Sequence, residues 1–456
     1  MKIIFFIPAA LLSFLACSNT SNNERNDTTY DPPDLSVTEI QINTTERRQP
    51  MDGVGADCWT FPFANDVGWN WDQVKFVFDE LNIKYIRIAP WFNFWEEYND
   101  NSDPDSTDWT AFDKSGITTT HDLGLARYAI SRGIEVDLGI WGVSDWLLKT
   151  KDPASIDPAL YPELGESIAS YIKFMKDHGV DIKVAEIQNE PNIAAGNQYA
   201  GPEDLESATL QILRQLNRFG LKSVMLHTPN LATPDDTRAW GTVLLSNDTI
   251  LARTAAISYH TWWVDNFSSY DDIRQFAAGK NKPVWATEIG YCALAEGCFG
   301  GTHFLKPETW GTAWDYALSF YRAIEWSRAS RLYHWSLLGH DGVVSPSGSR
   351  LVSFWVLKHF ANFIPAGSYY LQGDSGDANL LCMPFEFPDG TWSAILINTS
   401  SNDKFIQLSG AVPFTITEAE QTTRTAYYRI QSPIKNKKGE EGYLIPGESL
   451  TSFKMK

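Results

Sequence analysis

The stretch VAEIQNEPN (residues 184–192) starts as a strand and ends on a carboxylate that is followed by proline. Val184 and Ile187 are typical of a strand, and Pro191 does not continue one. Glu190 therefore stands where the strand stops. It is either a solvated turn residue or a reactive acid at one end of a sheet, and the rest of the chain decides between these interpretations.

The same kind of short apolar run occurs eight times along the chain, and segments of helical period separate the runs. Three of the four clearest helical segments end at Gly, as helix C-caps prefer, and the fourth, residues 72–82, ends at Asn. Buried strands that alternate with helices predict a parallel sheet, and eight such units predict an α/β fold, a (β/α)8 TIM barrel. The runs are residues 51–59, 83–90, 134–141, 182–191, 222–230, 255–263, 283–290 and 332–339.

The pattern changes near residue 368, where short alternating runs with turn residues replace the helices. Residues 379–400 contain Asp389-Gly390 between two apolar runs, which is a hairpin signal. Residues 37–50 are also strand-like, and we expect them to join the same side β-sandwich. The predicted organisation is a leader at 1–17, a tether at 18–36, an N-terminal strand at 37–50, the barrel at 51–367 and the β-sandwich at 368–456.

The composition restricts the partners of the chain. Its 456 residues carry a formal net charge of −19, which disfavours nucleic acid and anionic membranes. A neutral substrate fits this charge better than a polyanion does, and a cation also stays open. The 18 Trp residues are mostly core material, but flat rings also stack on the apolar faces of sugars, so the excess favours a carbohydrate substrate.

The N-terminus predicts export. Lys2 precedes a short apolar run that ends at Cys17, which is too short for a spanning helix. The run resembles a bacterial lipoprotein signal with Cys17 as the lipidated residue, although Phe14 stands where Leu is usual, so ordinary cleavage stays open. We expect a lipoprotein of the outer membrane, cell surface or periplasm, or else a secreted protein. Membrane contact would come through the lipid anchor alone, and we expect a monomer. Cys292 and Cys298 form a disulfide or stay as two thiols.

Two carboxylates end the fourth and seventh runs, namely Glu190 and Glu288. In an eight-stranded barrel these strand ends face each other across the mouth. Carboxyl groups about 5 Å apart cleave a glycosidic bond with retention: one attacks the anomeric carbon and the other acts as acid and then base. Glu186 shares the strand face of Glu190, so parity leaves both as candidate acids. The terminal Asn-Glu-Pro turn favours Glu190.

Further polar residues fit around such a pair. Asn189 is a candidate for binding a sugar 2-hydroxyl. Arg87, inside the second run, needs an acidic partner if it is buried, and Glu288 would supply one and stay ionised. His227 and His260 lie near the ends of the fifth and sixth runs, where each is either a site residue or a satisfied core histidine.

With these residues, the chain resembles glycoside hydrolase clan A, and within it family 30. Asn189-Glu190-Pro191 is similar to the clan's acid/base motif, and Glu288 in WATEIG to its nucleophile strand. The stretches that look like family 30 in particular are residues 51–59, 141–150 and 354–368. The resemblance implies a retaining β-glycosidase with Glu190 as acid/base and Glu288 as nucleophile, and it implies no metal or organic cofactor.

The chain departs from the family pattern at three strand ends. His260-Thr261-Trp262 replaces the usual His-x-Tyr, so Trp262 or Tyr259 takes the place of the Tyr that contacts the nucleophile. Glu96 or Glu97 stands in for an Asp that binds the terminal sugar in some exo-acting members. Trp335-Ser336 replaces Trp-Asn, and Trp335, like Trp141, His260, Trp262 and Arg87, is expected near the substrate.

Three functional hypotheses follow. The first is hydrolysis of a neutral β-linked polysaccharide, namely β-1,6-glucan, β-1,6-galactan or β-xylan. The second is a clan A activity outside family 30, such as β-1,3-glucanase or β-mannanase. The third, of another class, is a non-catalytic glycan-binding surface protein on the same barrel.

Overall fold

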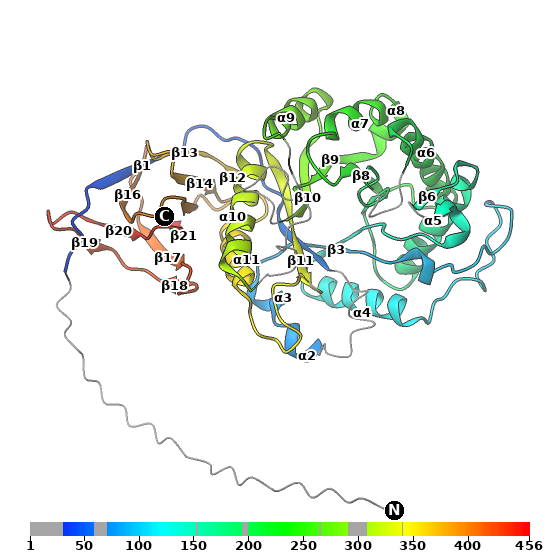
Figure 1. The fold of residues 1–456 in the computed structure, drawn as a ribbon, viewed down its shortest axis with the longest axis horizontal. Helices are drawn as coiled ribbons and strands as arrows, with labels where there is room; N and C mark the ends of the chain where they lie inside the picture. Colours follow the sequence, from blue (N-terminus) through cyan, green and yellow to red (C-terminus); the bar gives the residue numbers. More distant parts are fainter. Residues whose placement is uncertain are drawn as a thin grey trace, which may run out of the picture.

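The computed structural model describes residues 31–456 except 59–70, 152–153, 194–198, 263, 265, 291–307 and 340. Eight parallel strands close into a barrel in the order β10-β11-β2-β3-β4-β7-β8-β9, on the right of Figure 1. The predicted barrel is therefore confirmed, one strand for each apolar run. The strands are β2 (Gly53–Cys58), β3 (Tyr85–Ile88), β4 (Glu135–Leu138), β7 (Val184–Glu186), β8 (Met225–Leu231), β9 (Thr254–His260), β10 (Val284–Ile289) and β11 (Ala329–Leu338).

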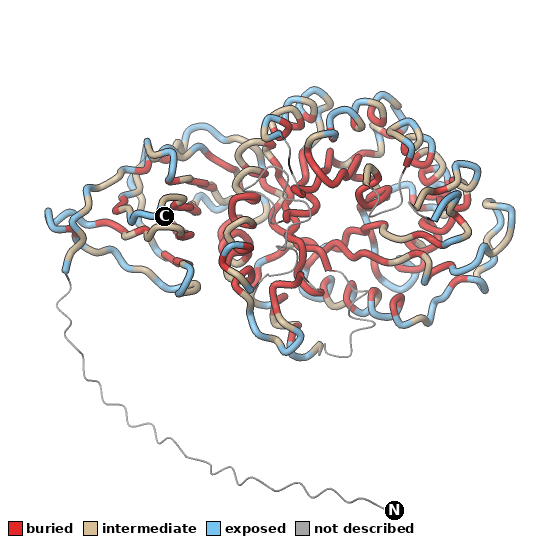
Figure 2. The backbone as a smooth tube through the Cα atoms, viewed as in Figure 1, coloured by how far each residue is buried: buried red, intermediate tan, exposed pale blue. Residues whose placement is uncertain are grey.

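Helices surround the barrel and bury its strands from outside. Every residue of β2, β10 and β11 is buried, as expected for strands covered on both faces, and Figure 2 shows this buried centre in red. The helices are α2 (Trp71–Val74), α3 (Val77–Glu80), α4 (Ile117–Ser131), α5 (Tyr161–Asp177), α6 (Pro202–Arg218), α7 (Thr237–Leu244), α8 (Asp248–Arg253), α9 (Ser268–Lys280), α10 (Trp310–Glu325) and α11 (Val352–Phe363).

Three of the four helical segments expected from the sequence end at the predicted glycine. Gly133, Gly179 and Gly220 follow α4, α5 and α6 with positive φ angles of 74°, 87° and 73°, which glycine adopts without steric cost. The segment 72–82, expected as one helix, is divided into α2 and α3. Between them the backbone tightens, since Phe78 N–H donates to the Lys75 carbonyl at 3.2 Å, an i→i+3 bond.

Short elements lie in the loops that follow two barrel strands. The loop after β3 contains η1 (Phe92–Phe94), and the loop after β4 contains η2 (Asp145–Leu147), a two-stranded hairpin of β5 (Leu148–Lys151) and β6 (Ala154–Ile156), and η3 (Pro158–Leu160). These loops stand at the carboxyl ends of their strands, the end where barrels of this type carry their chemistry.

Both ends of the chain build the β-domain at the left of Figure 1. In its first sheet, ordered β13-β1-β16-β20-β19, β1 pairs with β13 and β16. The predicted contribution of the N-terminal strand is therefore confirmed. The second sheet is ordered β12-β14-β15-β21-β17-β18. The strands are β1 (Val37–Asn43), β12 (Tyr369–Tyr370), β13 (Gln372–Asp374), β14 (Leu380–Glu386), β15 (Trp392–Asn398), β16 (Lys404–Gly410), β17 (Ile416–Thr422), β18 (Arg429–Ile430), β19 (Ile434–Lys435), β20 (Glu441–Ile445) and β21 (Ser449–Met455).

The second sheet packs on the barrel through α11. Buried His359 on that helix bonds through its ring nitrogens to the Ser452 and Thr422 hydroxyls, both at 2.8 Å. The predicted hairpin is also present, with β14 antiparallel to β15 and Gly390 at φ 81° in the connection. The two domains therefore share a buried contact.

Three cysteines of the sequence analysis, Cys17, Cys292 and Cys298, lie outside the described residues. The lipid anchor and the disulfide therefore stay predictions. Within the described part of the chain, no helix combines the length and the apolar character needed to cross a membrane.

Candidate active site

Glu190 and Glu288 meet at the carboxyl ends of β7 and β10. One oxygen of each carboxylate and a ring nitrogen of His260 all lie within 4.8 Å of one another. Glu288 belongs to β10, whereas Glu190 lies four residues beyond β7 in a turn. Its backbone adopts a positive φ of 47°, uncommon for a residue with a side chain, and its N–H donates to the Asn230 carbonyl at 3.2 Å. The turn at Pro191 thus places this carboxylate opposite Glu288.

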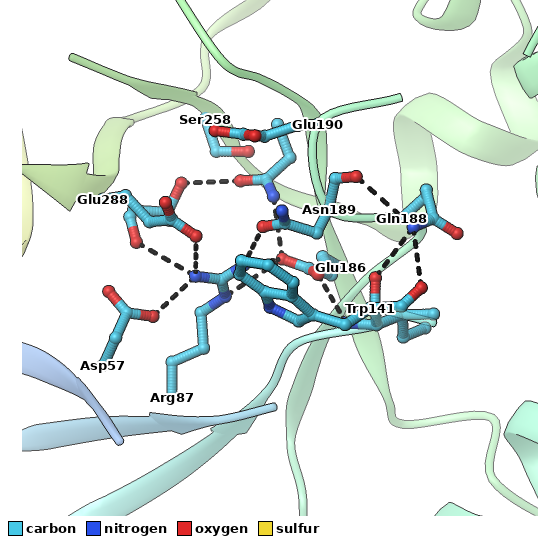
Figure 3. Close-up of polar contacts among 12 residues, drawn as sticks. Asp57, Arg87, Trp141, Glu186, Gln188, Asn189, Glu190, Ser258 and Glu288 are labelled. Atoms are coloured by element: carbon cyan, nitrogen blue, oxygen red, sulfur yellow. Dashed lines mark hydrogen bonds and ion pairs between the residues drawn. The ribbon is translucent and has the colours of Figure 1, made fainter. Parts of the chain in front are cut away.

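Arg87 on β3 is the centre of the network beneath the pair (Figure 3). It is fully buried, and its Nη1 donates to Glu288 Oε1 at 2.7 Å and to Asp57 Oδ1 at 2.5 Å. Its Nη2 donates to Glu186 Oε2 at 2.8 Å and to Asn189 Oδ1 at 2.6 Å. The expected pairing of Arg87 with Glu288 is confirmed. The guanidinium therefore holds Glu288, Asp57, Glu186 and Asn189 in fixed relative positions.

Trp262 and His260 complete the contacts of the two carboxylates. Trp262 donates its indole N–H to Glu288 Oε2 at 2.9 Å. Of the two candidates for this contact, Trp262 and Tyr259, it is therefore Trp262 that contacts Glu288. Tyr259 instead bonds through its hydroxyl to Ser327 at 2.7 Å. His260 Nδ1 lies 2.8 Å from Glu190 Oε1 and 3.2 Å from Glu288 Oε2. The imidazole therefore bridges the pair.

Glu186 occupies a different environment from Glu190. Its Oε2 accepts bonds from Arg87 and from Asn230 Nδ2, the latter at 2.8 Å, and its Oε1 accepts the Ile140 N–H. Both oxygens are thus held by protein donors, and the side chain is fully buried. This geometry gives Glu186 a supporting place and leaves Glu190 as the acid that faces Glu288.

Burial raises the pKa of both carboxyl groups of the pair, but the opposing forces differ. At Glu190, burial and then the charge of Glu288 raise the pKa well above its usual range, against a smaller lowering by Arg87. At Glu288, burial raises the pKa, while the charge and hydrogen bond of Arg87 and the Trp262 N–H lower it. The pKa of Glu190 is raised more strongly, so a proton is held first on Glu190, whereas Arg87 and Trp262 oppose protonation of Glu288. Burial lowers the pKa of His260 well below its usual value, so the imidazole is neutral.

A row of indole rings runs from the Glu288 side of the site. Trp262 meets Trp335 edge to face at 6.4 Å between centroids, Trp335 stacks on Trp141 at 5.4 Å, and Trp141 stacks on Trp91 at 6.5 Å. The Trp141 carbonyl accepts the Gln188 side-chain N–H at 3.0 Å, which links the backbone of Trp141 to the segment between β7 and Glu190. The expected Trp141, Trp262 and Trp335 are therefore brought together.

Other candidates lie elsewhere or were missed. His227 is buried and bonds to the Ser258 hydroxyl at 2.9 Å, as a satisfied core histidine does. Glu96 is buried against Asp100, and Glu97 is exposed. Asp57, which shares Arg87 Nη1 with Glu288, was not anticipated. Its only signal is a charge inside an apolar run.

Two groups of acidic and histidine side chains among the described residues have the spacing of metal ligands: the active-site trio Glu190, His260 and Glu288, and a second group of Asp100, Glu163 and Glu166. In the first group, Arg87 and Trp262 already occupy the two oxygens of Glu288. That donor set suits a carboxylate held by hydrogen bonds better than a metal ligand.

A scan against protein-family models gives no match, and a search of curated proteins gives none. Solved structures do match. A family 30 endoxylanase from Clostridium papyrosolvens C71 is 16% identical, with a TM-score of 0.73 over 91% of this chain and 99% of that one. A family 30 subfamily 8 xylanase from Clostridium acetobutylicum is 16% identical, with a TM-score of 0.69 over 92% and 99%. An endo-β-1,6-glucanase is 18% identical, with a TM-score of 0.65 over 92% and 94%. The resemblance to clan A and family 30 is thus confirmed for the fold, barrel and side β-domain together.

Proposed function

We propose that this protein is a retaining β-glycoside hydrolase that cleaves β-linked glycans by double displacement. One observation carries the proposal: the Glu190 and Glu288 carboxylates approach within 4.8 Å across the barrel mouth. Retaining glycosidases hold their two carboxyl groups about 5–5.5 Å apart, whereas inverting enzymes leave about 6.5–9.5 Å for a water molecule. The separation fits direct attack by one carboxylate.

The surroundings of each carboxylate assign the roles. Glu288, bonded to Arg87 and Trp262, attacks the anomeric carbon and forms a glycosyl-enzyme ester. Glu190, whose pKa is raised by burial and by Glu288, gives its proton to the leaving oxygen. Once Glu288 is esterified its charge is gone, the pKa of Glu190 falls, and Glu190 can take a proton from the attacking water.

A neutral polysaccharide is the substrate that these features favour. The net charge of −19 disfavours polyanionic glycans, and the indole row of Trp91, Trp141 and Trp335 offers apolar faces to sugar rings. The matched structures are described as xylanases and an endo-β-1,6-glucanase. We therefore propose β-xylan, β-1,6-glucan or β-1,6-galactan as the substrate class.

The test begins with a panel of β-xylans, β-glucans and β-galactans, on which release of reducing ends and product length are measured. On the best substrate, Glu288→Gln and Glu190→Gln should each lose at least about 10³-fold in kcat, while Glu135→Gln, an exposed carboxylate at the amino end of β4, should keep wild-type rates. Azide should restore turnover of Glu190→Ala on an activated aryl glycoside and give the β-glycosyl azide. Near-normal hydrolysis by either Gln variant would refute the assignment, and an α-azide product would refute retention.

A further inference from the structure

A second cluster of acids lies outside the active-site group, between a loop and a helix. Asp100 belongs to the loop between β3 and α4, and Glu163 and Glu166 belong to the first two turns of α5. One oxygen from each lies within 4.8 Å of the others, and Glu163 and Glu166 are only 6% and 1% exposed. The proposed hydrolysis uses none of these residues.

Glu96 supplies a second, independent observation at this cluster. The side chain is 1% exposed, and its Oε2 has no hydrogen-bond partner. The Asp100 N–H reaches its other oxygen at 3.4 Å, so this carboxyl lies against the cluster. Asp100 Oδ1 and Glu166 Oε2 are likewise buried and lack a hydrogen-bond partner. Buried carboxylate oxygens without a donor are costly, and here three of them come from one group of neighbouring residues.

The charges around the cluster are poorly balanced. Arg218 Nη2 contacts Glu166 Oε1 at 2.9 Å, and the Thr107 hydroxyl donates to the same oxygen. Together they leave Glu166 Oε2 without a donor. The Asp108 N–H donates to Asp100 Oδ2 at 2.5 Å. Among the described residues, Arg218 is the cation paired with this group of four acids.

We propose that Glu96, Asp100, Glu163 and Glu166 form a Ca²⁺ site. Calcium binds 6–8 oxygen ligands at about 2.3–2.6 Å in adaptable geometry, so opposed ligands stand about 4.6–5.2 Å apart. One oxygen each of Asp100, Glu163 and Glu166 lies within 4.8 Å of the others, which is close enough for the three to share one such ion. Magnesium needs a tighter octahedron at about 2.0–2.1 Å and keeps most of its water, so it fits a cluster of four carboxyls less well.

The ion would link the loop after β3 to helix α5. The same loop contacts α6, where Arg214 pairs with Asp105, and it begins at Trp91, the outer ring of the indole row. Ca²⁺ thus stabilises one conformation of a loop that reaches the substrate side of the barrel. This inference does not depend on the proposed hydrolysis.

Calorimetry with CaCl2 on the chelator-treated, purified protein tests the site. We expect one ion bound with a Kd at or below about 10⁻³ M. At a hundredfold excess over Kd, Ca²⁺ should raise Tm by about 3 °C for a chain of this size, and equal MgCl2 should raise it less. Absence of both heat and Tm shift with CaCl2 would overturn the proposal.

Variants locate the ion. Glu163→Gln should weaken Ca²⁺ binding at least tenfold, whereas Glu97→Gln, which changes the same charge on an exposed neighbour of Glu96, should leave it unchanged. Glu288→Gln should also keep the Kd, because the active-site trio is the other group with metal-ligand spacing. Binding that survives Glu163→Gln and is lost in Glu288→Gln would place the ion in the active site and refute the inference. Calorimetry reports on each variant directly, whether or not the variant changes Tm.

Discussion

Replacing Glu288 with Gln should make Glu190 a stronger acid. The substitution keeps the shape of the side chain and removes a negative charge within 4.8 Å of the Glu190 carboxyl. Two unit charges 4.8 Å apart repel by about 3.5 kcal/mol at an effective dielectric constant of about 20. The free energy of ionising Glu190 should therefore fall by about 3.5 kcal/mol, and its pKa should fall with it.

Carbon NMR of protein labelled at the glutamate carboxyl carbons measures this change. The Glu190 resonance is identified by its absence from Glu190→Gln, and its titration is followed in wild type and Glu288→Gln. Glu186→Gln is the matched control, since the Glu186 charge raises the pKa of Glu190 less than the Glu288 charge does. An unchanged Glu190 titration in Glu288→Gln, or an equal shift in Glu186→Gln, would refute the assigned coupling.

Three further outcomes follow from the same contacts. Trp262→Phe removes the 2.9 Å donor to Glu288; a bond to a charged group contributes about 1.5–3 kcal/mol, so kcat/KM should fall roughly 10- to 100-fold with an unchanged circular dichroism spectrum, and a loss under threefold would contradict the role. Arg87→Met leaves buried carboxylates without their cation and should lower the free energy of unfolding by about 3–5 kcal/mol, as measured by urea denaturation. A loss below about 1 kcal/mol would show that the Arg87 network is not essential for stability. Burial raises the pKa of Glu186 to about 7, so between about pH 4.3 and 7 the folded state holds a proton that the unfolded state releases. The free energy of unfolding should therefore decrease as pH rises through this window. Glu186→Gln should flatten that decrease, whereas an unaltered slope would assign the decrease to other groups.

The barrel was predictable because its strands are buried on both faces. Such strands form continuous apolar runs, and an eightfold repeat of run and helix has few alternative folds. Arg87 was predictable by the same logic, since a cation inside an apolar run must find an acid. Its partner Asp57 was not, because the sequence does not show which of several inward-facing acids reaches the guanidinium.

The uncertainty between Glu186 and Glu190 had a physical cause. Alternation of side chains applies only within a strand, and β7 ends at Glu186. Residues 187–190 leave the strand, and the left-handed backbone of Glu190 redirects its side chain. The period-two rule therefore placed both acids on one face, whereas three-dimensional packing gives one to Arg87 and presents the other to Glu288.

The pairing of Val37 with Phe405 sets an order on biosynthesis. The strand β1 emerges early from the ribosome, but its neighbours β16 and β13 are made only after the whole barrel. Until then Ile40 and Ile42, both buried in the finished domain, face water or a chaperone. All eight barrel strands have been made once β11 is complete, whereas β1 finds its partner β16 only later. A nascent chain arrested before β16 would therefore expose an unpaired apolar strand, which quality-control proteases and chaperones can recognise.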